Sequence, residues 1–554
     1  MSKLITVQRK PLSLVLSALT LTMANGVSAA DSNLEVFAEN ASYYRDEVGL
    51  SKFRNTLQLE FESKFSSNLF RSISVNAIIR GTYDGVYDMN DDEFGEDVTY
   101  QYLGEDWHSS DVSSPVILTP GVAVPCENDT LLCHNLDGYM DQDSNDIRYP
   151  DFNDSYDFIR ELYVTADTVV GGDDILSFRL GKQQVVWGKT DLFRVLDVIN
   201  PVDYSRHNIY DELEDIRIPQ WMLKVDWRMG ANKVFDDSNF QLVWNFDEFR
   251  PSNLGTCGQS YRILDAGCFF SSYVNASYLN AVLGSMGLPA LYAGNVPIIH
   301  DVEEPDWNLS NTQVGLKWEG VYGDATFSLN ALTYRQQLPS LHFRPFAEGL
   351  PIPAADGVFD IVFPRVNLLG GAIDYYSMAA DAVWRVEFAY TEGEELARDT
   401  DGHKETEMAR YVIGLDKNLV IPALGTQSAF LISVQLFGEH ILDFEKDMPN
   451  EEDNWIATML FKGFYINNRL SPQIILAHDV GGKATAIAPS ISYLSGNHWL
   501  FNLGLNIKTG GDETFPWTVA GGASVTEPLS RFTNGPIGVA NNEDEVQLTI
   551  RYSF

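Results

Sequence analysis

The sequence predicts an all-β protein: a single transmembrane antiparallel β-barrel of about 16–18 strands, with long extracellular loops and short periplasmic turns. Three observations support this fold. Apolar and polar residues alternate with a period of two in many segments of roughly ten residues, no stretch after the N-terminal region approaches 18 consecutive apolar residues, and the last such segment ends on an aromatic residue. A chain that crosses the bilayer without apolar helices has to form a closed barrel, because backbone polar groups inside the bilayer must be paired.

The N-terminus is predicted to be a signal peptide over residues 1–29. Lys3, Arg9 and Lys10 precede the apolar run 12–23, and small residues at 27–29 suit cleavage. This run is shorter than the roughly 20 residues that span a bilayer. We therefore expect export, with residues 30–554 forming the barrel in the outer membrane of a Gram-negative bacterium.

The alternation assigns a face to each residue of a strand. In 57–62, apolar residues alternate with polar ones, and the same pattern recurs in 220–228 and 384–390. A charge that faces lipid at the midplane costs roughly 2–4 kcal/mol, so the polar face is expected to line the lumen. The candidate pore-lining residues are Glu60, Glu62, Arg179, Gln183, Lys224, Asp226, Arg228, Arg385, Glu387, Arg410, Asp416, Glu439 and Arg551.

The lengths of the connections provide a consistency test. Both termini of a bacterial barrel lie in the periplasm, so connections after odd-numbered strands are external and long. The long connections are expected at about 84–156, 188–218, 249–311, 336–362, 391–407, 441–453 and 509–543. The alternation is weakest in 34–44 and in 359–376, where Gly370 and Gly371 interrupt it. Apolar residues at helical spacing in 275–291 predict a helix that either enters the lumen or covers the external mouth.

The cysteines form two local pairs inside predicted external loops. Cys126 lies near Cys133, and Cys257 lies near Cys268. The spacing does not match a zinc site, whereas an exported protein is in an oxidising compartment. We expect two disulfide bonds, each adding roughly 2–3 kcal/mol by the chain-entropy estimate.

The charge balance is strongly acidic, with 77 Asp and Glu against 38 Lys and Arg. Nucleic acid is therefore excluded as a partner. Asp141, Asp143 and Asn145 match the opening of a calcium loop, but Asp146 stands where glycine is required and Phe152 where glutamate is required. A complete EF-hand is excluded. The sequence predicts no cofactor, unless the acidic external loops bind calcium or bridge lipopolysaccharide phosphates through it.

The C-terminal segment 545–554 alternates throughout and ends with Tyr552 and Phe554. It resembles the closing strand of outer-membrane barrels, whose terminal aromatic residue is read by the barrel assembly machinery. The resemblance implies that this machinery is a partner, together with the lipid bilayer and lipopolysaccharide.

A more specific resemblance lies at 181–188, which reads GKQQVVWG and is followed by DVINPVD at 197–203. These stretches resemble the signature of a porin-like outer-membrane family described only as a domain of unknown function. Members are often encoded beside resistance-nodulation-division exporters and periplasmic lipid-carrier-like proteins, which implies movement of lipophilic molecules. This chain departs from the commoner form at Lys182, Lys189 and Thr190. The motif serves either a ligand contact, or barrel curvature and the docking of the turn at Asn200 and Pro201.

These features predict a porin-like channel for small solutes and no enzymatic activity. The alternative is a conduit for lipids or other hydrophobic molecules, working with an exporter of the resistance-nodulation-division type and a periplasmic carrier. An outer-membrane hydrolase is disfavoured, because the nine histidines are scattered and no local motif pairs one with a nucleophile.

Overall fold

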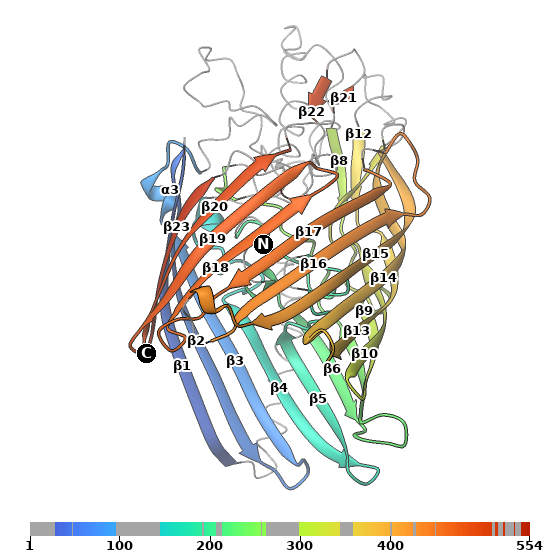
Figure 1. Ribbon diagram of the computed structural model, residues 1–554. Coiled ribbons are helices and arrows are strands. Elements are labelled where there is room, and N and C mark those ends of the chain that lie inside the picture. The colour runs from blue at the N-terminus through green and yellow to red at the C-terminus, as the bar shows by residue number, and fades with distance from the viewer. Residues whose placement is uncertain are drawn as a thin grey trace.

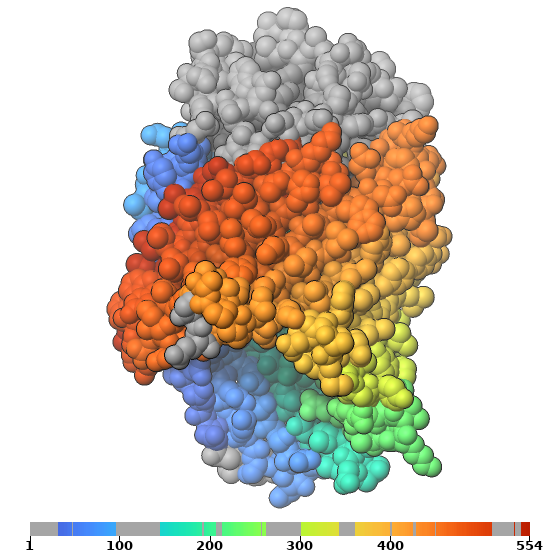
Figure 2. All heavy atoms as spheres, viewed as in Figure 1, coloured from blue at the N-terminus to red at the C-terminus, as the bar shows by residue number. Residues whose placement is uncertain are grey.

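The computed structural model describes residues 28–46, 48–95, 144–190, 193–206, 213–255, 258–261, 298–343, 358–398, 402–424, 428–448, 450–511, 516–518, 524–526, 537 and 544–554. Eighteen strands form one antiparallel sheet, and the first strand pairs with the last, so the sheet closes into a barrel (Figure 1). The predicted fold class is confirmed, at the upper end of the predicted strand count. In Figure 2, the strands coloured from orange to red form a continuous wall on the face toward the viewer.

Each strand of the barrel pairs with its neighbours in the chain. The strands are β1 (Ser28–Arg45), β2 (Gly49–Ser66), β3 (Ser72–Asp84), β4 (Ile159–Val170), β5 (Asp174–Gln183), β6 (Gln220–Arg228), β7 (Asp237–Asn245), β9 (Gln313–Tyr322), β10 (Ala325–Arg335), β13 (Arg365–Ser377), β14 (Ala382–Arg398), β15 (Gly402–Leu419), β16 (Phe430–Ile441), β17 (Asp453–Lys462), β18 (Leu470–Asp479), β19 (Ala484–Ser495), β20 (Trp499–Gly510) and β23 (Glu545–Ser553).

The outer face of the barrel is apolar, as the alternation predicts. Leu57, Leu329 and Phe388 are 48%, 56% and 47% exposed, although each lies within a paired strand. Such exposure suits a surface covered by lipid rather than by water. The barrel is therefore a transmembrane barrel of the outer membrane.

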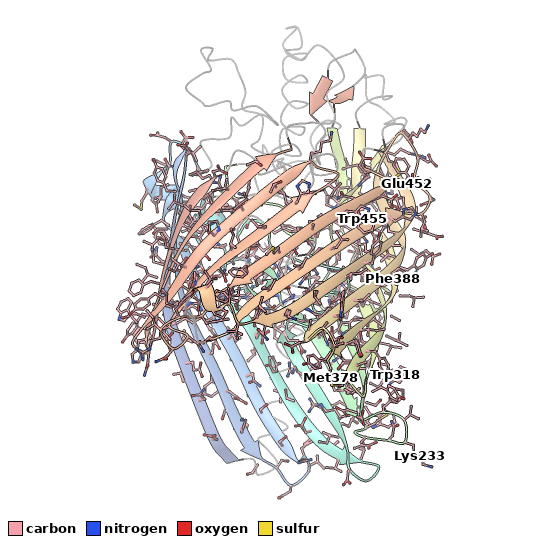
Figure 3. The ribbon with its side chains drawn as sticks, viewed as in Figure 1. Lys233, Trp318, Met378, Phe388, Glu452 and Trp455 are labelled. Carbon is pink, nitrogen blue, oxygen red and sulfur yellow. The ribbon has the colours of Figure 1, made fainter. Side chains whose placement is uncertain are left out.

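The longest connections all leave one end of the barrel. They are 85–158, 184–219, 246–312, 336–364 and 511–544. When the eighteen barrel strands are counted in chain order, each of these connections follows an odd-numbered strand. By the rule for bacterial barrels, this end is extracellular. Figure 3 labels Glu452, in the connection between β16 and β17, and Lys233, in the turn between β6 and β7, at opposite ends of the molecule.

The predicted loop 391–407 is wrong. β14 runs on to Arg398 and β15 starts at Gly402, with register pairs that include Glu395 with Glu405. This part of the hairpin is rich in acidic residues and lacks an apolar face, because it extends beyond the lipid. Backbone pairing forms there without the alternation that marks a membrane strand.

Smaller elements lie in the connections between the barrel strands. β8 (Ile298–Glu303), β11 (Ser340–Phe343) and β12 (Val358–Val362) form a three-stranded sheet, and β21 (Pro516–Thr518) pairs with β22 (Ser524–Thr526). The short helices are α3 (Val86–Met89), α4 (Ser144–Arg148), α5 (Leu213–Ile216), η3 (Leu309–Asn311) and η5 (Pro422–Leu424). Within the described ranges, none of the helices has the length and apolar character needed to cross a bilayer.

Several predicted features lie outside the described residues. These are residues 1–27 of the signal peptide, the helix at 275–291, Asp141 and Asp143 of the calcium loop, and Cys126, Cys133, Cys257 and Cys268. Of the calcium-loop candidates, Asn145 is described, and it is an exposed residue of α4.

Candidate functional site

The described parts of the connection between β5 and β6, residues 184–190, 193–206 and 213–219, fold into the barrel; we call them together the inward segment. Trp187, Leu196 and Ile199 are fully buried. They pack in one apolar cluster with wall residues of strands between β6 and β16, namely Met222, Val243, Leu332, Tyr334, Val366, Leu368, Ala389, Val412 and Phe437. The sequence predicts this connection as an external loop. It folds inward because its own apolar side chains and the apolar patch of the wall cover each other.

Two glycines of the wall make room for the inward segment. A β-carbon added at Gly315 would lie 2.5 Å from Trp187 Cη2, and one added at Gly370 would lie 2.5 Å from Leu196 Cδ2. Gly370 is one of the residues that interrupt the predicted strand pattern. Its role is to let another part of the chain approach the inner wall closely.

Polar contacts fix the motif region of the inward segment. The Trp187 indole nitrogen donates to Gln241 Oε1 of β7 at 2.7 Å, and Arg385 Nη1 donates to the backbone oxygen of Lys189 at 2.7 Å. The backbone nitrogen of Lys189 donates to the Glu387 carboxylate. Gly188 has a φ of +89°, and a β-carbon there would lie 2.8 Å from Glu387 Oε2. The motif is thus a docking element for the wall of β14.

The opposite part of the inward segment is held by buried charges. Arg217 donates to Asp197 Oδ2 from Nε at 2.8 Å and from Nη2 at 2.5 Å, and both side chains are almost fully buried. Arg160 of β4 donates to the Arg217 backbone oxygen at 2.9 Å, and Arg80 of β3 forms a 2.7 Å ion pair with Asp215. The segment therefore reaches from the wall of β13–β16 to the wall of β3 and β4.

Asn200 joins the two ends of the inward segment. Its side-chain oxygen accepts from the Val185 backbone nitrogen, and its side-chain nitrogen donates to the Ile218 oxygen, both at 2.9 Å. Asn200 is fully buried. These contacts support the structural role of the motif, in which the turn at Asn200 and Pro201 docks against the strand ends.

Lys182 lies in a second buried charge cluster at the rim. Its Nζ is 3.0 Å from Asp157 Oδ1, and Arg250 forms a bidentate pair with the same carboxylate at 2.9 and 2.8 Å. Burial by itself raises the pKa of Asp157, but the charges of Arg250 and Lys182 outweigh it and hold the pKa well below its usual 3.8. The preceding Gly181 has a φ of +147°, which lets the strand bend where Lys182 meets the rim.

The structure places the predicted lining residues in two settings. In the first, they belong to packed networks: Gln183 is fully buried and donates to the Met222 oxygen at 3.0 Å, Glu387 binds the inward segment, and Arg410 lies 2.7 Å from Glu439. Arg385 pairs with Asp416 beside the segment. These groups hold the inward segment and the wall together.

In the second setting, they make contacts within the strands of the barrel wall, and that they line the lumen stays a prediction. Lys224 pairs with Asp226 at 3.2 Å, and Arg551 pairs with Glu39 at 2.7 Å. The Arg179 guanidinium lies 4.4 Å from the centre of the Tyr163 ring. The remaining candidates are Glu60, which accepts from Gln58 at 2.7 Å, Glu62, which pairs with Lys64 at 3.4 Å, and the exposed Arg228.

Glu394 is not among the lining residues that the alternation predicts. Arg385 and Glu387 face inward, so strict alternation turns residue 394 outward. A bulge at Gly393, whose φ is +86°, shifts the register by one, and Glu394 pairs with Arg410 at 2.5 Å. The glycine within an alternating strand is the signal that identifies such a position.

A cavity of about 180 Å³ lies between the inward segment and the β14–β15 hairpin. Its lining combines two arginines and two glutamates with tyrosine side chains and backbone of the connection after β10. The residues that carry this chemistry are Arg194, Arg410, Glu394, Glu395, Tyr204 and Tyr334.

At the C-terminus, the backbone nitrogen of Phe554 donates to the Val36 oxygen of β1 at 2.9 Å. The Tyr552 ring lies between Trp499, at 4.7 Å, and Phe554, at 4.9 Å between ring centres. Phe554 itself is 72% exposed. The side chain that the assembly machinery is expected to read is thus accessible, and that role stays a prediction.

Comparisons with known proteins bear on the fold and the family. A search of curated protein sequences found no significant relative. Similar solved structures include the outer membrane protein OpdK of Pseudomonas aeruginosa (8% identity, 95% of this chain and 99% of that chain covered, TM-score 0.39). They also include OccK3 (OpdO) of Pseudomonas aeruginosa (10%, 97% and 98%, TM-score 0.42) and OccAB3 of Acinetobacter baumannii (9%, 95% and 99%, TM-score 0.40).

The family comparison covers nearly the whole chain. A family model described as a protein of unknown function (DUF1302) matches residues 6–554. This match agrees with the resemblance at 181–188, and the structure adds the closed barrel with its apolar outer face. The chain therefore belongs to the DUF1302 family of porin-like outer-membrane barrels.

Proposed function

We propose that this protein is a selective channel for small polar solutes, in which the inward segment narrows the lumen. The observation that carries the proposal is the cavity between the inward segment and the β14–β15 hairpin, which lies inside a barrel with a polar lumen. A wide open pore passes solutes by size, whereas a packed constriction forces a solute past fixed side chains.

The lumen on the periplasmic side suits polar solutes. The Arg551–Glu39 pair is partly exposed there, as is Lys224, whose partner Asp226 is buried, and Arg228 is exposed. Groups of both signs give a polar environment without a strong bias toward one sign of charge. Such a wall favours hydrated solutes over acyl chains.

The cavity indicates the class of solute. Its two arginines and two glutamates balance in charge, and Arg410 is already paired with Glu394. A net anion or cation would leave one pair unbalanced, whereas a neutral or zwitterionic solute can exchange hydrogen bonds with both signs. The tyrosines Tyr204 and Tyr334 add flat apolar surface for a small ring or carbon chain.

The alternative is a conduit for lipids that works with a resistance-nodulation-division exporter and a periplasmic carrier. Such a conduit requires a continuous apolar path. Among the described residues, the largest cluster of apolar side chains in the lumen is packed against the inward segment, with none of its buried members more than 6% exposed. We therefore favour the polar channel and treat the conduit as an outcome of the test.

The test is single-channel recording of the purified full-length protein in planar bilayers. The wild type is expected to show small, resolved conductance steps, and the double variant Trp187→Ala/Leu196→Ala is expected to show larger ones, because it removes the two side chains that seat the inward segment. The matched control is Trp384→Ala, since Trp384 lies in β14 and is 42% exposed on the outer face. Its conductance should equal that of the wild type.

Solute choice is tested in proteoliposomes. Neutral and zwitterionic solutes should swell the vesicles faster than anions or cations of equal size. A barrel that is folded but conducts no ions, in both the wild type and the double variant, and that retains phospholipid through purification, would overturn the channel and support the conduit.

A further inference from the structure

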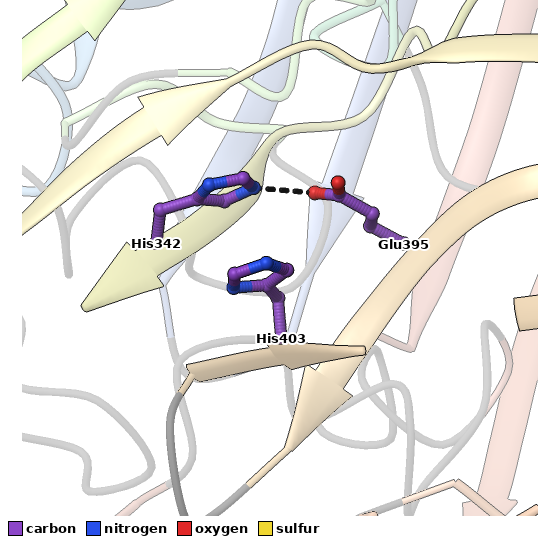
Figure 4. Close-up of side chains that lie close together, drawn as sticks. All are labelled: His342, Glu395 and His403. Atoms are coloured by element: carbon purple, nitrogen blue, oxygen red, sulfur yellow. Dashed lines mark hydrogen bonds and ion pairs between the residues drawn. The ribbon is translucent and has the colours of Figure 1, made fainter. Parts of the chain in front are cut away.

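We infer that His342, Glu395 and His403 form a binding site for a divalent transition metal, with zinc as the expected ion. The three side chains come from β11, β14 and β15 at the extracellular end of the barrel and lie close together (Figure 4). The sequence does not reveal this site, because His342 lies 53 residues before Glu395 and none of the three residues lies in a recognisable motif.

The geometry brings the donor atoms within reach of a single ion. His342 Nε2 lies 2.5 Å from Glu395 Oε2, and the His342 and His403 rings are stacked at 3.6 Å with an angle of 2° between their planes. One donor atom from each residue lies within 4.8 Å of the other two. In tetrahedral zinc sites with bonds of about 2.0–2.2 Å, donors lie roughly 3.3–3.6 Å apart, so an ion requires His342 Nε2 and Glu395 Oε2 to move apart. The two rings must also turn out of their parallel stack, because a ring nitrogen binds a metal in the plane of its own ring.

The backbone holds the three residues in this arrangement. Glu395 lies across from Glu405 in the β14–β15 register and Ala397 lies across from His403, so Glu395 and His403 are diagonal neighbours on one face of the hairpin. The Gly393 bulge turns Glu394 to Arg410 and leaves the next residue, Glu395, to face His342.

The position of β11, which carries His342, is fixed on two sides. Leu341 and Ile361, paired across β11 and β12, are buried. The Gln336 side chain donates to the Glu395 oxygen at 3.1 Å and accepts from the Glu395 nitrogen at 2.8 Å, as a neighbouring strand would. The cluster is therefore built on strand backbone, which suits a site of defined geometry.

The donor set determines the type of ion. Two imidazoles and one carboxylate match zinc and other first-row transition metals, whereas calcium and magnesium require oxygen donors. Three protein ligands leave a fourth position for water or for a ligand. The side chains of His342 and Glu395 are 30% and 12% exposed, so an ion can enter from solvent.

A bound ion would join β11 to the β14–β15 hairpin. Glu395 lines the cavity described above, as do Ser340 and Leu341 of β11. The metal would thus fix one wall of that cavity. The metal site does not depend on what passes through the barrel.

The test is zinc titration of the full-length folded protein, purified without a histidine tag, treated with chelator and followed by calorimetry. The wild type is expected to bind one equivalent with high affinity. His342→Ala, His403→Ala and Glu395→Gln should each weaken binding by about 100-fold or more, since the loss of even a supporting group costs metal sites about 10–100-fold.

Two control variants test whether the loss of zinc binding is specific to the three proposed ligands. Glu405→Gln removes the exposed carboxylate directly across from Glu395, and His478→Ala removes a histidine that is hydrogen-bonded to Thr485. Both should bind zinc as the wild type does, and heat-modifiable migration verifies that every variant is folded. Wild-type binding no tighter than that of the His342→Ala/His403→Ala double variant would overturn the site.

Discussion

The indole of Trp187 lies directly over Gly315, so that a β-carbon at residue 315 would come within 2.5 Å of the ring. Trp187 belongs to the inward segment and Gly315 to β9, which otherwise presents its outer face to lipid. This contact joins the lumen constriction to the barrel wall. It makes the fit of the inward segment depend on the absence of one side chain.

Replacement of Gly315 by valine is therefore expected to displace Trp187. Overpacking of this kind costs about 1–3 kcal/mol, and we expect that loss in the free energy of unfolding measured with denaturant. Single-channel conductance should rise in the same variant, because the inward segment loses the contact of Trp187 with the wall. Gly504→Val is the control: a β-carbon there meets Ser490 Cβ at 3.3 Å, on a part of the wall remote from Trp187. Equal conductance of the two variants would contradict the role of Gly315.

Asp197→Asn is expected to destabilise the inward segment strongly. It leaves the buried Arg217 without its partner, and removing one member of a buried pair costs about 3–5 kcal/mol. Equilibrium unfolding in detergent measures the loss. Glu62→Gln breaks the exposed pair with Lys64 and should change stability by no more than about 1 kcal/mol. A loss for Asp197→Asn as small as that for Glu62→Gln would show that the charge is hydrated rather than buried.

The stability of the extracellular rim should depend on pH through Asp157. Its folded-state pKa lies well below 3.8, so the ionised carboxylate contributes stability above pH 3.8, and the contribution is lost as the pH falls through the folded-state pKa. Asp157→Asn should therefore lower the unfolding free energy at pH 7 and flatten its dependence on pH below 4. The comparison is Asp154→Asn, an exposed residue of the same connection. An acid dependence equal to that of the wild type would exclude Asp157 as its source.

Arg228→Glu should shift ion selectivity toward cations without a change in stability. Arg228 is exposed, and two unit charges 4 Å apart in water interact by about 1 kcal/mol, so a change of two charge units should alter the barrier for a passing cation by no more than about 2 kcal/mol, or about thirtyfold. The reversal potential under a salt gradient measures it, and high salt should weaken the shift. Glu405→Gln, on the extracellular hairpin, provides the comparison. A reversal potential that does not move would mean that ions do not pass Arg228.

The barrel, and the face on which most of its residues lie, can be predicted from the amino-acid pattern alone. A strand that passes through lipid must turn every second side chain toward the bilayer, so the alternation around Leu57 and Phe388 shows which side chains face lipid. The family motif at 181–188 was also visible, because it is a contiguous stretch. The strand count reached the observed eighteen for the same reason.

Which segment folds inward, and which distant groups meet, depends on the folded barrel. In the sequence, the inward segment looks like an external loop, because it follows an odd-numbered strand. It folds inward because Trp187 and Leu196 fit against Gly315 and Gly370, which are more than a hundred residues away. The Gly393 bulge likewise reversed the parity of Glu394 and brought Glu395 to His342. Contacts of this kind depend on closure of the barrel, and a local pattern carries no information about them.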